Sequence, residues 1–393
     1  MKRKITELFT DFFESEKTGG LILITCTIIS LVIANTNVGP VYISFWHQYL
    51  DGSFANIDLR LTNEHWINDG LMTIFFLLVG LEIERELFKG ELSSARSAIL
   101  PIMAAIGGMA IPAGIHFLFN NGTITQAGIG IPMATDIAFA LGVLSLLGNR
   151  VPVAIKIFLT ALAIIDDLGA VIIIAIFYTN DFSFSYFAGA IGIFLLLMIF
   201  NKTGIKNLWF YLIPGFAMWY FMLQSGVHAT ITGILLAFAI PFANDDEKNP
   251  SYKIQHWLHK PVAFLILPLF ALANTGIILD NNSYKSLFTT NGLGIVLGLL
   301  IGKPVGIILF SYIAVKTKLS DIPQNMNWRL MFGAGLLAGI GFTMSIFITN
   351  LAFSDPAHVQ ESKISILFAS LLAGALGYFF LKSSLPINNF EKK

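Results

Sequence analysis

The sequence predicts an all-α polytopic membrane protein with twelve transmembrane helices. Of the 393 residues, 55% are hydrophobic and only 12% are charged, and the mean hydropathy is +0.73. A soluble domain carries about 25% charged residues, so a soluble core cannot account for this composition. The formal net charge is zero and no basic stripe is present, so nothing indicates a nucleic-acid partner. The placement of the charges along the chain supports the number of spans.

Apolar segments long enough to cross a bilayer, about 17–25 residues, recur along the whole chain. They predict one transporter domain over residues 1–393, and spans seven and eight almost touch at Gln224–Ser225. The spans are expected near residues 19–35, 66–84, 98–119, 124–147, 153–178, 184–200, 207–223, 225–242, 257–279, 292–315, 328–351 and 363–382.

Basic residues test the number of spans independently, because cytoplasmic loops of membrane proteins are enriched in Lys and Arg. With twelve spans and both termini in the cytoplasm, only Arg60, Lys285 and Lys363 of the 24 Lys and Arg fall in external segments. Lys303 falls inside a span. An odd number of spans would scramble this asymmetry. The sequence therefore predicts that both ends of the chain are cytoplasmic.

Two segments outside the spans have their own patterns. Residues 1–18 carry apolar side chains at helical spacing and predict an interfacial amphipathic helix, with a frayed tail as the alternative. Residues 44–63 contain the turn dipeptide Asp51-Gly52, followed by alternation of Ile57, Leu59 and Leu61 with polar residues, which predicts an external β-hairpin. A lone hairpin is marginally stable in water, so we expect it to pair with another surface, such as a second copy of the chain.

Four ionisable residues are expected deep within the spans: Asp136, Asp166, Asp167 and Lys303. Such residues are rare in membranes and mark functional sites, because burying each charge costs at least a few kcal/mol. Asp166 and Asp167 are adjacent near the middle of span five. Neighbours on a helix point about 100° apart, so the two acids either line two walls of one cavity or divide ion binding and salt bridging between them.

Lys303 lies in the middle of span ten and needs a buried partner for its charge. Glycines repeat every fourth residue on this helix, at Gly294, Gly298, Gly302 and Gly306. Such a stripe allows another helix to approach closely, which we expect to bring the lysine near span five. Pro304 removes a backbone donor beside it.

Spans four and eleven are expected to be broken. Gly128–Pro132 interrupts span four, and Thr135-Asp136 then resembles the N-cap of a new half-helix. Gly333–Gly341 interrupts span eleven. Broken spans in matching halves of a transporter indicate the binding site. Asp136 and Lys303 are then expected to compensate the dipoles of the half-helix ends.

Several long motifs resemble the NhaA family of Na⁺/H⁺ antiporters, and the resemblance covers nearly the whole chain. Broken helices are a known feature of that family, so this agreement is not independent evidence. The motifs are FFLLVGLEIERELFKGEL, ATDIAFALG, ALAIIDDLGAV, GVHATITG, LPLFALANTGI, GKPVGI and GIGFTMSIFI.

The resemblance implies a fold in which spans three to five and ten to twelve are inverted repeats and spans four and eleven cross. It implies that Asp166 and Asp167 bind the transported Na⁺ and the proton, with Lys303 as the partner of Asp166. Thr135 and Asp136 match the pair in the broken helix near the site.

The resemblance also assigns candidates for regulation. Glu82, Arg85 and Glu86 match the charged cluster of the family's pH-sensing region, and His256 and His259 match its histidines; a solvated helix end with ion pairs is the alternative for the cluster. Gln255 departs from the family pattern, which leads us to expect a Glu before the first of these histidines. Asp69 and His228 lie in matching motifs with supporting roles. The family's external hairpin mediates dimers.

The expected function is an electrogenic antiporter of the bacterial inner membrane. It would export Na⁺ or Li⁺ in exchange for H⁺ under the control of pH, as a homodimer within the lipid bilayer, with no cofactor and no enzymatic reaction. The alternatives are a sodium-coupled symporter of an organic acid and an ion channel. A symporter needs a polar cavity for its solute, and a channel usually has a filter built from rings of carbonyls or charges.

Overall fold

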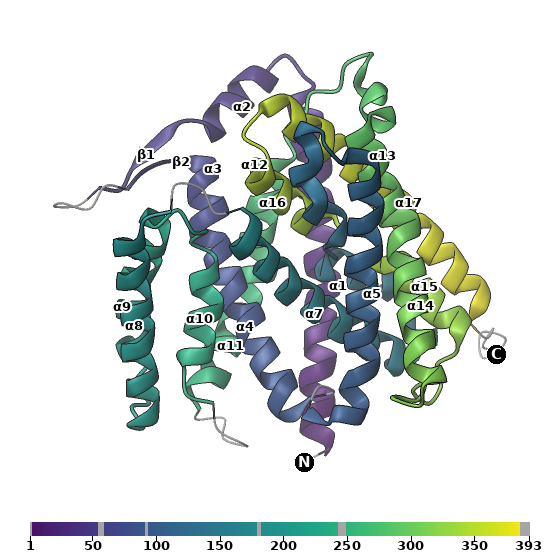
Figure 1. Cartoon of the computed structure of the whole chain (residues 1–393), viewed down its shortest axis with the longest axis horizontal. Helices are drawn as coiled ribbons and strands as arrows, with labels where there is room; N and C mark the ends of the chain where they lie inside the picture. The colour runs from purple at the N-terminus through teal and green to yellow at the C-terminus, as the bar shows by residue number, and fades with distance from the viewer. Residues whose placement is uncertain (1, 54–58, 91–92, 179–181, 243–248, 386–393) are drawn as a thin grey trace. The chain divides into compact units, whose positions relative to one another are not determined.

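The computed structural model describes residues 2–53, 59–90, 93–178, 182–242 and 249–385 of the chain (Figure 1). These residues divide into two units. The first comprises residues 1–24, 86–170 and 279–393, and the second comprises residues 25–85 and 171–278. Within the first unit the elements are α1 (Lys2–Ala34) as far as residue 24, α5 (Ala95–Asn120), the 3-10 helix η3 (Ile124–Met133), α6 (Ile137–Ser145), the short η4 (Gly148–Arg150), α7 (Val153–Phe177) as far as residue 170, η6 (Ser283–Phe288), α13 (Thr290–Leu297), the wide π-type turn η7 (Gly298–Gly302), α14 (Lys303–Lys316), α15 (Trp328–Ala338), α16 (Phe342–Ala352) and α17 (Pro356–Ser384).

The second unit contains the remaining parts of α1 and α7 and most of α4. Its other elements are α2 (Gly39–Trp46), β1 (Tyr49–Asp51), β2 (Arg60–Thr62), α3 (Asn63–His65), the π-type turn η1 (Trp66–Leu71), α4 (Met72–Lys89), α8 (Phe184–Lys202), α9 (Trp209–Gln224), α10 (Ile231–Ala239), α11 (Pro250–Pro261), the π-type turn η5 (Val262–Ile266) and α12 (Leu267–Asn274).

The described residues include seven helices long and apolar enough to cross a membrane, or ten if each of three bent pairs counts as one span. These ten overlap ten of the predicted spans. The other two predictions, 207–223 and 225–242, fall on α9 and α10, which have 16 and 9 residues. The chain leaves α9 at Ser225 and turns through Gly226, whose φ is +80°, so several residues that were assigned to a span form a loop.

Both predicted breaks are present in the first unit. η3 and α6 meet at a bend of 42°, and α15 and α16 meet at a bend of 46°. Residues 2–18 are the beginning of α1, which continues without interruption into the first predicted span. The position of this segment at a membrane surface stays a prediction.

The predicted β-hairpin is present in the second unit, with a longer loop than expected. β1 and β2 are antiparallel, and Asp51 pairs with Arg60. Asp51-Gly52 therefore does not form a two-residue turn, because the connection runs from residue 52 to residue 59. Ile57 lies outside the described residues. Leu59 is buried in a cluster with Trp219 and Ala229, so the hairpin is anchored to α9 of its own unit.

The glycine stripe of span ten packs against α5. A Cβ atom at Gly306 would overlap the backbone of Gly107, and one at Gly302 would contact Pro112. Figure 1 shows α5 and α13 side by side. The lysine of span ten does lie near span five, as expected, because its Nζ is 2.7 Å from Oδ2 of Asp166. The stripe itself packs against α5, which is span three, and not against span five. The stripe indicates that a helix can approach closely, and its partner depends on the rest of the fold.

This close contact predicts the effect of adding a single methyl group. Gly107→Ala should lower the free energy of unfolding by roughly 1–3 kcal/mol, because the new Cβ overlaps backbone atoms that cannot move independently. Gly114→Ala is the matched control, since it lies on the same helix and nothing lies within 4 Å of its Cβ position. Thermal unfolding in detergent measures both. Equal midpoints for the two variants would contradict the packing of α5 against α14.

Candidate ion-binding site

The two broken spans are joined at their breaks by hydrogen bonds. The backbone N–H of Asp136 donates to the carbonyl oxygen of Ile340 at 2.7 Å. The hydroxyl of Thr135 donates to the carbonyl oxygen of Ala338 at 2.9 Å, and that of Ser345 donates to Ile131 at 2.7 Å. Each break leaves backbone groups without the partners of a regular helix, and the other broken span supplies replacements for several of them.

Asp136 caps two half-helices at once, which confirms its prediction as an N-cap. Its Oδ1 accepts from the backbone N–H of Phe139 in α6 at 2.9 Å. Its Oδ2 accepts from the backbone N–H and the hydroxyl of Thr343 in α16, at 3.0 and 2.5 Å. Helix N-termini carry partial positive charge, so one carboxylate offsets two of them. Thr343 lies just after the glycine break of span eleven, but the sequence assigned it no role in the site.

Lys303 compensates the opposite kind of helix end. Its Nζ lies 2.7 Å from Oδ2 of Asp166, and both side chains are fully buried. The same ammonium donates to the carbonyl oxygen of Met133, the last residue of η3. The carbonyl end of a helix carries partial negative charge, which the lysine offsets. The geometry confirms both the pairing of Lys303 with Asp166 and its contact with a broken helix.

The carboxylate of Asp166 is asymmetrically bonded. Oδ2 accepts from Lys303 and from the Thr135 hydroxyl at 2.8 Å. Oδ1 is buried and has no hydrogen-bond partner among the described residues. One oxygen is therefore held in place, and the other remains able to accept a proton or ligate a cation.

Asp167 is also fully buried and interacts electrostatically with Lys303. Both acids of the adjacent pair therefore interact with one lysine, although only Asp166 contacts it directly. Carboxylate oxygens are the ligands that small hard cations prefer. The first unit thus brings together Thr135, Asp136, Asp166, Asp167 and Lys303, the five residues predicted to form the ion site.

The candidates for pH sensing gather on two elements of the chain. Glu82, Arg85 and Glu86 lie on α4, and His256 and His259 lie on α11. His259 interacts electrostatically with Arg85 and with His256, so Arg85 of α4 and the two histidines of α11 are close together in the second unit. A regulatory role for these residues stays a prediction.

Glu84 is a buried acid that the sequence reasoning missed. Its Oε2 accepts from the hydroxyl of Ser251 on α11 at 3.3 Å. Gln255, where the family pattern leads to the expectation of a Glu, is also buried and lies one helical turn after Ser251. The sequence contained a signal for this acid, because glutamates alternate at positions 82, 84 and 86. On a helix, Glu84 must then point away from the other two.

The two supporting candidates make structural hydrogen bonds in the second unit. The carbonyl oxygen of Asp69 accepts from the indole N–H of Trp219 at 2.9 Å. The Nε2 atom of His228 lies 2.9 Å from the carbonyl oxygen of Tyr178, at the end of α7. The first contact joins η1 to α9, and the second joins the segment before α10 to the end of α7. Supporting roles for Asp69 and His228 in transport stay a prediction.

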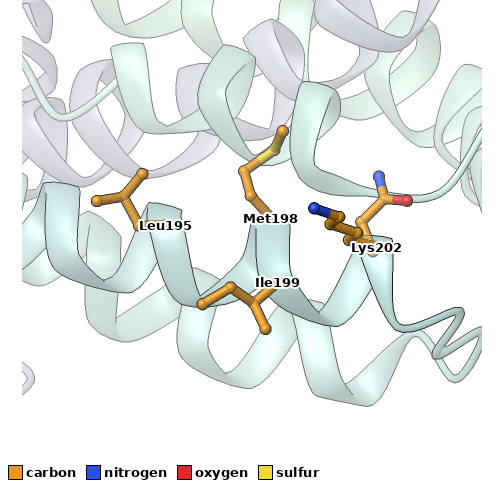
Figure 2. Close-up of a pocket in the computed structure, with 5 residues that line it drawn as sticks. Leu195, Met198, Ile199 and Lys202 are labelled. Carbon is orange, nitrogen blue, oxygen red and sulfur yellow. The ribbon is translucent and has the colours of Figure 1, made fainter.

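A surface groove lies on α8 of the second unit. Figure 2 shows its lining side chains, which are mostly apolar. They are Leu195, Met198, Ile199, Asn201 and Lys202. The groove includes none of the candidate site residues.

Comparison with known proteins agrees with these observations. Residues 10–381 match the model of a family described as Na⁺/H⁺ antiporter 1. The chain is 57% identical over 390 residues to the Na(+)/H(+) antiporter NhaA of Flavobacterium psychrophilum, covering 99% of this chain and 100% of the relative. A protein of the same name from Dechloromonas aromatica is 56% identical over 382 residues, or 96% of each chain. The Na(+)/H(+) antiporter NhaA 1 of Clostridium beijerinckii is 47% identical over 386 residues, with 97% and 96% covered.

The buried ion pair predicts a large loss of stability when one partner is removed. Lys303→Ala should lower the free energy of unfolding by about 3–5 kcal/mol, because it leaves the Asp166 carboxylate without its countercharge. Lys285→Ala is the control, since this lysine is exposed and its removal should change stability by less than about 0.5 kcal/mol. Thermal unfolding in detergent is the measurement. A Lys303→Ala variant as stable as the control would mean that Asp166 does not need the lysine.

Proposed function

The chain belongs to the Na⁺/H⁺ antiporter 1 family and is a multi-pass membrane protein that exchanges Na⁺ for H⁺; from this premise, we propose that the two ions compete for Asp166 and Asp167. The asymmetric bonding of Asp166 carries the proposal. Its Oδ2 is held by Lys303 and Thr135, while Oδ1 has no partner among the described residues. A proton and a Na⁺ ion both require the negative charge of the same carboxylate, so each displaces the other.

Lys303 acts as an internal substitute for the transported cation. With no ion bound, its ammonium neutralises Asp166 at 2.7 Å. A Na⁺ ion or a proton arriving at the carboxylates weakens this attraction, because the carboxylate charge is then shared or lost. Alternating access of the same site to the two sides of the membrane converts this competition into exchange.

We extend the proposal to electrogenic exchange, to Li⁺ as a transported ion and to the inverted repeats. Two carboxylates can each carry a proton against a single Na⁺ ion, which would make the exchange electrogenic. Li⁺ is smaller than Na⁺ and equally suited to oxygen ligands, so we include it as a transported ion. The hydrogen bonds that join the two glycine-broken spans at Asp136 support inverted repeats formed by spans three to five and ten to twelve, with spans four and eleven crossing.

We also propose how the chain is arranged in the membrane, how two copies assemble and which charges set the pH dependence. The distribution of Lys and Arg supports twelve spans with both termini in the cytoplasm of a bacterial cell, and so an inner-membrane location. The hairpin strands β1 and β2 would join two copies of the chain. The charges of α4 and α11 would tune the pH at which exchange begins. Membership of the family does not favour the symporter or the channel.

Exchange should require both acids of the pair. Asp166→Asn and Asp167→Asn are nearly isosteric but cannot carry the charge that binds a proton or Na⁺, so each should abolish Na⁺-driven proton movement. The measurement is the dissipation of an imposed pH gradient in proteoliposomes after addition of Na⁺, Li⁺ or K⁺. Asp280→Asn is the control, because Asp280 is exposed and is not one of the buried acids of the site. Exchange at the wild-type rate in Asp167→Asn would contradict the assignment of Asp167 to the ion site.

Competition also predicts how the Na⁺ requirement depends on pH. Where the carboxylates take up protons, half-saturation by Na⁺ should rise about tenfold per unit fall in pH for one displaced proton, and about a hundredfold for two. At higher pH it should level off, because the carboxylates are already ionised. Titrating Na⁺ across a pH series in proteoliposomes gives the slope. A constant half-saturation with a rising maximal rate would instead indicate control by the Glu82, His256 and His259 region.

A further inference from the structure

The hydroxyl of Thr135 has one proton and two acceptors. Its Oγ1 lies 2.8 Å from Oδ2 of Asp166 and 2.9 Å from the carbonyl oxygen of Ala338. A hydroxyl donates one hydrogen bond, and the bond weakens steeply when its angle departs from linearity. Thr135 can therefore make a strong hydrogen bond to only one of these oxygens at a time. The two acceptors belong to different parts of the transporter, namely the ion site and a broken helix.

The carbonyl oxygen of Ala338 depends on a donor from outside its own helix. Ala338 is the last residue of α15, and in an unbroken helix its carbonyl would accept from the backbone N–H of Phe342. That N–H donates instead to the hydroxyl of Ser370 on α17, at 3.2 Å. Thr135 thus supplies a hydrogen bond that the break in span eleven has removed, and both groups are buried.

The strength of the other acceptor changes with the state of the ion site. An ionised carboxylate accepts hydrogen bonds roughly twice as strong as those of a neutral group. With Asp166 ionised and paired with Lys303, the Thr135 proton is drawn toward Oδ2. Once a proton or Na⁺ at Oδ1 takes up the carboxylate charge, Oδ2 becomes a weaker acceptor and the carbonyl of Ala338 becomes the better one.

We propose that Thr135 is a positioning residue that couples occupation of Asp166 to the break in span eleven. In the lysine-paired state its hydroxyl bonds Asp166, and in the ion-occupied state it bonds Ala338 and fixes the end of α15. Thr135 keeps its own proton throughout, and the proton that neutralises Asp166 comes from water. This inference rests on the proposed competition of Na⁺ and H⁺ for Asp166, and it assigns the contact through which that competition reaches the broken span eleven.

The test removes the hydroxyl and follows the broken helix directly. Thr135→Val keeps the shape of the side chain without its donor, and Thr135→Ser restores the donor. Thr349→Val is the matched control, because Thr349 is also buried and its hydroxyl bonds Ser345 within α16, away from Asp166. Hydrogen–deuterium exchange of the backbone amides of residues 339–342 is measured in the full-length protein with and without saturating Na⁺. Na⁺ binding is measured by calorimetry on the same samples.

In the wild type, saturating Na⁺ should slow amide exchange at residues 339–342 at least several-fold, because α15 gains a firm cap. Thr135→Val should bind Na⁺ within about tenfold of the wild-type affinity but lose the change in amide exchange, and its maximal transport rate should fall at least tenfold. Thr135→Ser and Thr349→Val should both respond like the wild type. An unaltered response in Thr135→Val would overturn the proposal. Loss of Na⁺ binding in Thr135→Val, together with loss of the response at residues 339–342, would also overturn it, since Thr135 would then be only a ligand.

A second variant keeps the proposal testable if Thr135→Val does not fold. Ser370→Ala removes the acceptor of the Phe342 N–H, which can then return to the Ala338 carbonyl and compete with Thr135. This variant should show a reduced effect of Na⁺ on residues 339–342, and a response equal to that of the wild type would count against the coupling. Failure of the proposed function has a different signature, because half-saturation by Na⁺ would then not depend on pH in the wild type.

Discussion

The ion pair between Lys303 and Asp166 is the interaction on which the arrangement of the site depends. Both side chains are fully buried and lie 2.7 Å apart. Removing two charges from water costs several kcal/mol for each ion, and their attraction repays this only with good geometry and additional hydrogen bonds. Here Met133 accepts a second bond from the lysine and Thr135 donates a second bond to the aspartate. An apolar pair could pack as well, so retaining the charges favours a role in binding ions over a role in stability alone.

The polar and charged side chains at the two breaks balance the ends of the broken helices. Asp136 sits between the N-termini of α6 and α16, while Lys303 and Thr135 meet the carbonyl ends of η3 and α15. The broken helices therefore do more than interrupt two spans. They create partial charges of both signs at the place where the ionisable residues are buried.

Much of this site could be predicted from the sequence, for identifiable reasons. Asp136 follows a Gly–Pro break and precedes an apolar run, which is a local signal for an N-cap, and burial of Asp166, Asp167 and Lys303 follows from their depth in apolar segments. The partner of the glycine stripe could not be read in the same way, because any helix backbone can enter such a groove and the choice of α5 is tertiary. Glu84 was missed because its neighbour Ser251 is distant in the sequence. The pairing of Lys303 with Asp166 came from the family resemblance, and the geometry then confirmed it.

The wide turn η7, residues Gly298–Gly302, ends directly before Lys303. In a regular α-helix, residues four apart drift by about 40° per step around the axis, so four glycines spaced in this way would spiral away from one neighbour. A π-type turn takes more residues per revolution and cancels part of this drift. It keeps the glycines against α5 while setting the direction in which Lys303 leaves the helix. The turn thus acts as an angular spacer: loss of one residue within it would rotate the lysine by about 100° relative to the preceding glycines. Insertions and deletions in this short stretch should therefore be far less tolerated in evolution than substitutions between apolar residues.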